Sequence, residues 1–126
     1  MLRIRSAQGV AAVLAGDIEQ PQEQALLARG APLAATLLLV PHHGSKTSSG
    51  AAFIEAVGPR WALVQAGYRN RYGHPAPEVV QRYRVAGAEV VDSSACGAAR
   101  WDSARPQQMQ CERTLQRRYW QHAGGR

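Results

Sequence analysis

Two adjacent histidines, followed by a glycine and a row of hydroxyl side chains, form the most reactive loop of this 126-residue chain. They directly follow residues 36–40, an apolar stretch with the composition of a buried strand. Imidazoles bind metals or move protons, and hydroxyl and ammonium groups donate hydrogen bonds to phosphate oxygens. The loop therefore predicts a site for a phosphate beside a metal ion. Its polar residues are His42, His43, Ser45, Lys46, Thr47, Ser48 and Ser49.

Two more polar residues follow apolar stretches in the same way. Asp17 comes after the apolar residues 10–15, and His74 follows residues 61–66 across a loop. The carboxyl ends of parallel strands meet along one edge of a sheet, so we expect Asp17 and His74 to approach the two loop histidines. A carboxylate with imidazoles is a ligand set for zinc or manganese, and a pair of such ions activates water toward a phosphoryl group.

Each of these residues also has an ordinary structural explanation. Asp17 could be the N-cap of the helix that follows it, and His74 could be a plain loop residue. The histidine pair is harder to explain in this way, because two adjacent side chains cannot both point into one core. One of the two could still be structural.

The apolar periodicity predicts strands that alternate with helices. Residues 2–6 and 10–15 read as a hairpin, and 36–40, 61–66 and 88–91 as further strands; helices are expected from residue 18 to Gly30, over 49–57 and from Pro77 to Gly87. The strand-helix repeats predict an α/β fold, or α+β, with a partly parallel sheet. Farther along we expect a turn at 93–97, a short strand at 98–101 and a terminal helix over 107–121.

The charge of the chain is uneven. The net charge is +6, from 15 basic and 9 acidic residues, and the excess lies after residue 59. Fourteen of the basic residues are arginines, whose planar fork suits phosphate. Two explanations account for this excess: a polyanion-binding surface, or ordinary solvated faces in a protein whose high-GC genome encodes arginine in place of lysine. No apolar run is long enough to cross a bilayer, so we expect the chain itself to be soluble.

The two cysteines, Cys96 and Cys111, are 15 residues apart and have no CxxC spacing. We therefore expect two unrelated thiols. A disulfide is possible only where this part of the chain faces an oxidising compartment.

Three segments, residues 14–19, 40–49 and 66–79, together carry a family resemblance. They resemble the C-terminal half of the metallo-β-lactamase-like domain of ComEC-type DNA-internalisation competence proteins, and the similarity extends from about Leu2 to Val91. The resemblance implies part of an αββα sandwich. Residues 2–105 would be a partial domain, and residues 106–126 a C-terminal helix or tail.

The resemblance also implies roles for individual residues. Asp17 would bridge two metals and His74 would complete one of them, while the His42–His43 loop is the family's own addition near the metals. One of these two histidines, with His43 the candidate ligand, would bind metal or donate a proton to the leaving oxygen. The groups that would hold phosphate or DNA are Ser45, Lys46, Thr47, Ser48, Arg69 and Arg71.

The main metal motif of that superfamily, a histidine-rich HxHxDH or HxDxDH run, would lie upstream of Asp17, and the sequence contains none. We therefore expect a fragment that binds zinc or manganese weakly or not at all. The resemblance places the parent protein in the bacterial inner membrane, with this domain on the periplasmic side. Its partners would be single-stranded or duplex DNA and the membrane channel portion of the same protein, and no small-molecule cofactor is implied.

Three functions are consistent with these motifs and charges. The first is a segment of a metal-dependent phosphodiesterase, a DNA nuclease, that serves DNA uptake. The second is a non-catalytic DNA-binding module that has kept the fold and the basic face. The third is a stand-alone metallo-hydrolase for a small molecule, which gives no reason for arginines spread over 60 residues.

Overall fold

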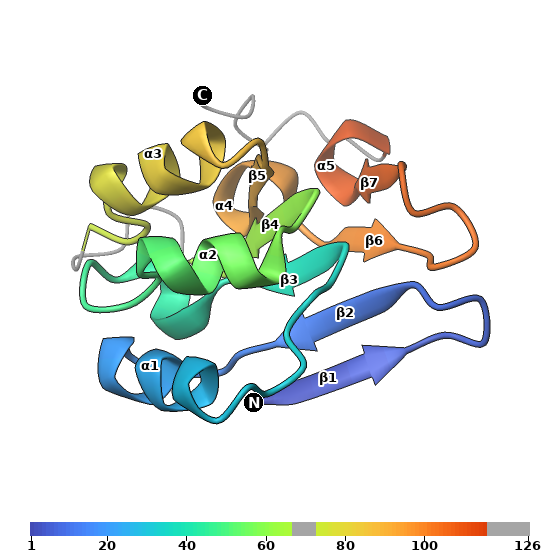
Figure 1. Cartoon of the computed structure of the whole chain (residues 1–126). Coiled ribbons are helices and arrows are strands. Elements are labelled where there is room, and N and C mark those ends of the chain that lie inside the picture. The colour runs from blue at the N-terminus through green and yellow to red at the C-terminus, as the bar shows by residue number, and fades with distance from the viewer. Residues whose placement is uncertain (67–72, 116–126) are drawn as a thin grey trace.

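The computed structural model describes residues 1–66 and 73–115, and its centre is a five-stranded sheet (Figure 1). The strand order follows the chain, β1-β2-β3-β4-β5, with β1 antiparallel to β2 and the remaining neighbours parallel. The strands are β1 (Leu2–Arg5), β2 (Ala11–Leu14), β3 (Leu37–Leu39), β4 (Trp61–Val64) and β5 (Glu89–Asp92). The predicted hairpin, the later strands and the mixed α/β class are confirmed.

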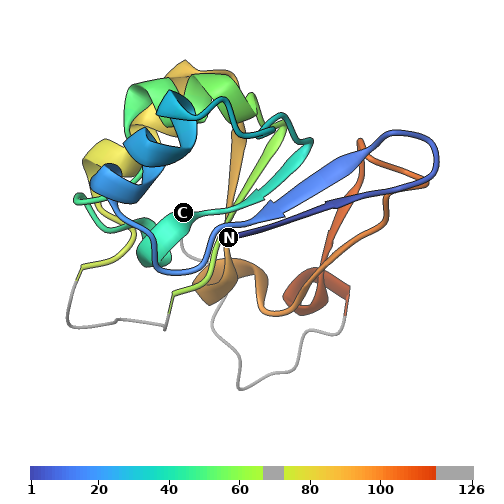
Figure 2. The same cartoon turned by 60° about the horizontal axis from the view of Figure 1, so that its bottom comes forward.

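Three helices cover one face of this sheet: α1 (Gln20–Ala28), α2 (Ala51–Val57) and α3 (Pro77–Val85) (Figures 1 and 2). Each connects two parallel strands, as such crossovers require. The core lies between the sheet and these helices. Its fully buried side chains include Val13, Leu38, Ala62 and Val64 from the sheet and Phe53, Ile54, Val79 and Tyr83 from the helices.

The chain after β5 differs from the sequence prediction. Residues 93–97, expected as a turn, contain the short helix α4 (Ser93–Cys96). The short strand near residue 98 is confirmed as β6 (Ala99–Trp101), and it pairs with β7 (Met109–Cys111) in a two-stranded antiparallel sheet. The predicted helix over 107–121 is therefore wrong at β7, because pairing with β6 overrides the local preference. Helix α5 (Glu112–Leu115) follows, and residues 116–126 lie outside the described part.

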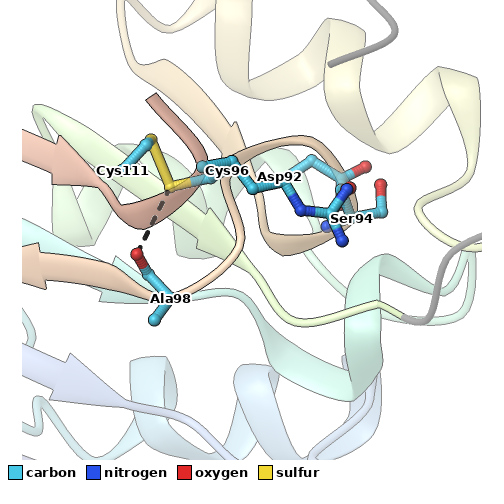
Figure 3. The surroundings of a disulfide bond; sticks show 6 residues. Asp92, Ser94, Cys96, Ala98 and Cys111 are labelled. Atoms are coloured by element: carbon cyan, nitrogen blue, oxygen red, sulfur yellow. Dashed lines mark hydrogen bonds between the residues drawn. A yellow bond between two sulfur atoms is a disulfide. The ribbon is translucent and has the colours of Figure 1, made fainter. Parts of the chain in front are cut away.

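A disulfide joins Cys96, at the end of α4, to Cys111, at the end of β7 (Figure 3). The expectation of two unrelated thiols is wrong. The hairpin of β6 and β7 returns the chain to α4, so that the Cα atoms of the two cysteines are 4.7 Å apart, within the range of ordinary disulfides. Sequence separation alone does not reveal this return.

The other face of the sheet is also apolar. Leu2 and Leu14 are register partners, as are Ile4 and Ala12, and the side chains of Leu2 and Ile4 are 55% and 53% exposed. At β4 this face is covered, because the indole N–H groups of Trp61 and Trp101 both donate to the carbonyl of Pro106, in the loop that joins β6 to β7. Among the described residues, no helix combines the length and apolarity needed to cross a membrane.

Candidate functional site

The histidine pair lies directly beyond the carboxyl end of β3, in a short 3-10 turn over Pro41–Gly44. Both histidines have left-handed backbone, with φ of 50° at His42 and 55° at His43, a conformation that costs free energy in residues other than glycine. Gly44 has a φ of 81°, and a Cβ added there would lie 2.6 Å from the Cβ of Pro75. The histidine turn and the segment that contains His74 are therefore packed directly against each other.

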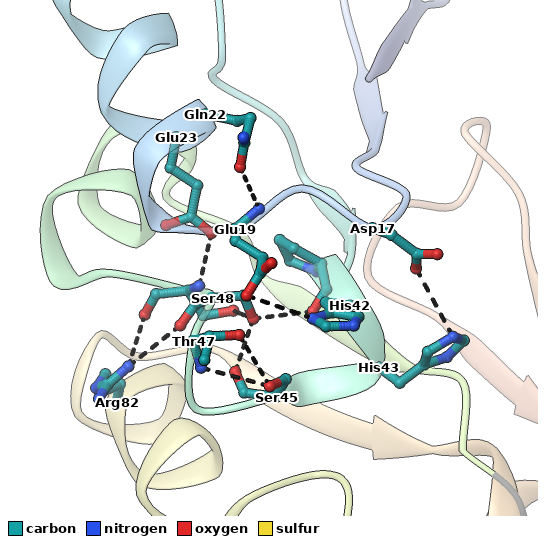
Figure 4. A network of polar contacts seen from close by, with 12 residues as sticks. Asp17, Glu19, Gln22, Glu23, His42, His43, Ser45, Thr47, Ser48 and Arg82 are labelled. Atoms are coloured by element: carbon teal, nitrogen blue, oxygen red, sulfur yellow. Dashed lines mark hydrogen bonds and ion pairs between the residues drawn. The ribbon is translucent and has the colours of Figure 1, made fainter.

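Asp17 and His43 face each other across this edge (Figure 4). His43 Nε2 lies 3.7 Å from Asp17 Oδ1, and the two side chains are 53% and 76% exposed. His43 Nδ1 is 2.7 Å from the carbonyl oxygen of Gln65. Because a carbonyl oxygen only accepts, Nδ1 carries the hydrogen of this contact. In the neutral ring, Nε2 is then the nitrogen with the lone pair, on the side that faces Asp17. A histidine whose second nitrogen donates to a backbone carbonyl is the usual form of a metal ligand.

His42 connects the other segments of the site. Its backbone N–H donates to the carbonyl of Gly16 at 2.8 Å, and its ring centroid is 6.1 Å from that of His74. Within the described part of the chain, His42 Nδ1 is buried without a hydrogen-bond partner, and a carboxylate oxygen of Glu19 lies 4.0 Å away. The three loops that the sequence singled out thus converge, as parallel strands predict.

The helix-cap explanation of Asp17 is wrong. The N-cap of α1 is Glu19, whose backbone N–H donates to the side-chain oxygen of Gln22 at 3.0 Å. The Asp17 carboxylate is therefore available to a ligand. Within residues 1–66 and 73–115, no group of three or more His, Cys, Asp or Glu side chains has the geometry of a metal site.

The hydroxyl groups of the loop divide into two classes. Ser48 is fully buried, and its hydroxyl donates to the carbonyls of Pro41 and Ser45, at 3.0 and 2.8 Å. It holds the turn together. Ser45 is also buried, and its hydroxyl is hydrogen-bonded to that of Thr47, whereas Thr47 and Lys46 are exposed. Arg69 and Arg71, the predicted DNA-steering residues, lie outside the described residues.

Glu23 is a residue that the sequence patterns did not single out. Its side chain is 1% exposed, and its carboxylate accepts hydrogen bonds from the backbone N–H groups of Ser49, at 2.6 Å, and Gly50, at 2.8 Å. Burial raises the pKa of this carboxyl, and the two backbone hydrogen bonds and Arg82 partly offset the effect. The sequence signal is weak: Glu23 is three residues before the buried Leu26, on the inner face of α1.

Helix α3 holds the same loop from the other side. Arg82 donates to the carbonyls of Ser48 and Ser49, at 3.3 and 3.2 Å, and the hydroxyls of Tyr83 and Ser49 are 2.8 Å apart. Ser49 itself has a φ of 58°. The carboxylate from α1 and the two side chains from α3 therefore fix the strained end of the loop that begins with the histidines.

Comparison with known proteins gives three similar segments. The chain is 33% identical to the protein named Competence protein ComA of Neisseria gonorrhoeae over 116 residues, which are 91% of this chain and 17% of that protein. It is 43% identical over 82 residues to Uncharacterized protein YcaI of Escherichia coli, covering 64% of this chain and 11% of that protein. It is 41% identical over 73 residues to ComE operon protein 3 of Bacillus subtilis, covering 58% of this chain and 9% of that protein.

No family model matches the chain, and no solved structure matches it. The chain is thus similar, over nearly its whole length, to a segment that makes up less than a fifth of a much longer protein named for competence.

Proposed function

We propose that this chain is part of a metal-dependent phosphodiesterase domain that acts on DNA during DNA uptake. The observation that carries the proposal is the arrangement of Asp17, His43 and Gln65. One carboxylate and one imidazole nitrogen, 3.7 Å apart, face the same exposed space, and the imidazole is oriented by a backbone carbonyl. The similarity to proteins named for competence supports the role in DNA uptake.

The described residues fit a divalent metal in part. Asp17 and His43 would hold it, with His74 brought near by its ring contact with His42. Zinc or manganese suits these ligands, and when bound it would polarise a phosphoryl oxygen and lower the pKa of water. A complete ligand set needs further groups from a longer protein of the αββα class, as the family resemblance implies.

The remaining polar groups of the loop have matching roles in the proposal. Lys46 and Thr47 are exposed beside the histidines and would donate to phosphate oxygens, together with Ser45. His42, whose ring centroid lies 6.1 Å from that of His74, would move a proton at the leaving oxygen. Ser48 takes no part in binding, because its hydroxyl is committed to the turn. Arg69 and Arg71 would add electrostatic attraction for the DNA backbone.

The proposed setting is the one that the family resemblance implies. The complete protein would reside in the bacterial inner membrane, with this domain on the periplasmic side and next to a channel portion of the same protein. DNA, single-stranded or duplex, would be its macromolecular partner.

The proposal is tested by single-turnover cleavage of end-labelled single-stranded DNA with Mn²⁺ or Zn²⁺, using the complete protein that contains this chain. Asp17→Ala should abolish cleavage, and Asp102→Ala should leave it unchanged. Asp102 is an exposed aspartate whose carboxylate, among residues 1–66 and 73–115, accepts only the N–H of Ala104, so it is a matched control. Salt-dependent DNA binding without cleavage by the wild-type protein would instead support the non-catalytic binding module.

A further inference from the structure

Ser93 lies outside the loops considered so far, at the start of α4, yet it contacts the peptide that orients His43. Its hydroxyl accepts a hydrogen bond from the backbone N–H of Ala66 at 3.0 Å and donates to the carbonyl of Ala66 at 3.1 Å. Both partners belong to one residue just beyond β4. The single hydroxyl therefore fixes the backbone on both sides of the Ala66 Cα.

The N–H of Ala66 and the C=O of Gln65 belong to the same peptide unit, which is planar. That carbonyl is the one that accepts the hydrogen of His43 Nδ1, at 2.7 Å. A continuous relay thus connects the Ser93 hydroxyl, the Gln65–Ala66 peptide and the His43 imidazole. Hydrogen bonds at the two ends of a peptide unit polarise it and strengthen each other.

Helix α4, which carries Ser93, is held in place by two hydrogen bonds and a disulfide. The side chain of Asp92 accepts the N–H of Ser94 at 2.8 Å, and Arg113 donates to the carbonyl of Ser94 at 2.7 Å. The disulfide between Cys96 and Cys111 closes its far end. The hydroxyl of Ser93 is thus presented from a rigid support.

We propose that Ser93 is a positioning residue of the candidate site, which holds the Gln65–Ala66 peptide so that its carbonyl fixes the ring and the tautomer of His43. Nε2 then keeps its lone pair toward Asp17, where a ligand would bind. The inference uses the proposed function only to call His43 a site residue. The hydrogen-bond relay itself is independent of any catalytic activity.

The test measures the tautomer of His43 by ¹⁵N NMR of the imidazole in the full 126-residue chain, with the signals assigned by comparison with His43→Gln. The spectra are recorded over a pH series, and the tautomer ratio is read at the alkaline plateau, where the imidazole signals no longer change with pH. In the wild-type chain the Nδ1–H tautomer should predominate. Ser93→Ala should lower the ratio of Nδ1–H to Nε2–H forms about twofold or more, because the peptide loses its second hydrogen bond.

Ser94→Ala is the matched control, since the Ser94 hydroxyl has no hydrogen bond within the described chain and only its backbone is used. It should leave the ratio unchanged, and Ser93→Thr, which keeps a hydroxyl, should restore it. An unchanged ratio in a folded Ser93→Ala chain would overturn the proposal.

If that variant does not fold, amide hydrogen exchange is measured in the wild-type chain instead. The Ala66 amide should exchange slowly because it donates to Ser93, and exchange at the rate of an amide without a hydrogen bond would overturn the relay. Neither readout depends on DNA cleavage, so the proposed function can fail without affecting this result.

Discussion

Glu23 on α1 and Ser49 in the loop before α2 are 26 residues apart in sequence, and the N–H of Ser49 donates to the buried Glu23 carboxylate at 2.6 Å. The same carboxylate accepts the N–H of Gly50 at 2.8 Å. One buried anion thus satisfies two backbone donors at the place where the loop has left-handed geometry. The helix after the Asp17 segment and the loop of the histidine pair are thereby joined.

Glu23→Ala should therefore lower the free energy of unfolding by about 3 kcal/mol, since the buried N–H of Ser49 and the partly buried N–H of Gly50 lose their acceptor. Urea denaturation measures this. Glu78→Ala is the control, because its carboxylate is 58% exposed and lies 3.7 Å from Arg82 on the same helix. Such a surface ion pair contributes about 0.5 kcal/mol or less. Equal losses for the two variants would show that the Glu23 hydrogen bonds do not stabilise the loop.

The raised pKa of Glu23 gives a definite dependence of stability on pH. Burial raises this pKa above its ordinary value of 4.5, so the folded chain binds the proton more tightly than the unfolded chain. The stability from this group is fully present below pH 4.5 and is lost as the pH rises through the folded-state pKa. The unfolding free energy of the wild type, minus that of Glu23→Gln, should therefore fall as the pH increases over this window. A difference that grows with pH would show that the hydrogen bonds and Arg82 outweigh burial.

The disulfide should contribute measurably to stability. It closes a loop with a sequence separation of 15, for which the loss of chain entropy in the unfolded state predicts about 3 kcal/mol. Urea denaturation of the Cys96→Ser, Cys111→Ser double variant should show a loss of this size. Adding reductant should shift the wild type toward the variant and leave the variant unchanged. A wild type insensitive to reductant would mean that the two thiols are unpaired in solution.

Gly44→Ala should destabilise the chain more than Gly87→Ala. Both glycines have positive φ, 81° and 89°, so the backbone strain is similar. Only at Gly44 would the new Cβ meet another segment, 2.6 Å from the Cβ of Pro75, whereas Gly87 has nothing within 4 Å. The additional loss at Gly44 should be about 1 to 3 kcal/mol, the usual cost of overpacking. Similar losses in thermal or urea unfolding would show that the two loops can separate at little cost.

The histidines of the proposed site should differ in role. In the complete protein, His43→Ala and His74→Ala should reduce metal content, since the first removes the nitrogen that faces Asp17 and the second the late ligand that the family resemblance implies. His42→Ala should keep the metal and lower single-turnover cleavage about 10² to 10⁴-fold, the usual effect of losing a general acid. Metal analysis beside cleavage separates the two roles. Parallel loss of metal in all three variants would make His42 a ligand.

The regular elements and the meeting of the site loops could be predicted because they depend on local patterns. Apolar periodicity and glycine or proline boundaries indicate the sheet strands and their helices, and the parallel-strand rule places Asp17 near His43. The hydrogen bonds from the N–H groups of Ser49 and Gly50 to the Glu23 carboxylate could not be predicted, because an acidic residue in a first helical turn is normally solvated there. Strand β7 and the disulfide could not be predicted either, because both depend on how the chain folds back from β6 to α4.

Strand β1 lies at one edge of the sheet in the described part of the chain, and its register places the exposed Leu2 and Ile4 on the face away from the helices. A free strand edge with apolar side chains is a template for pairing with another strand. Arg3 and Arg5, on the same strand, add charge that opposes such pairing. The chain produced on its own should therefore tend to self-associate at high concentration, and salt, by screening the two guanidinium groups, should promote this association.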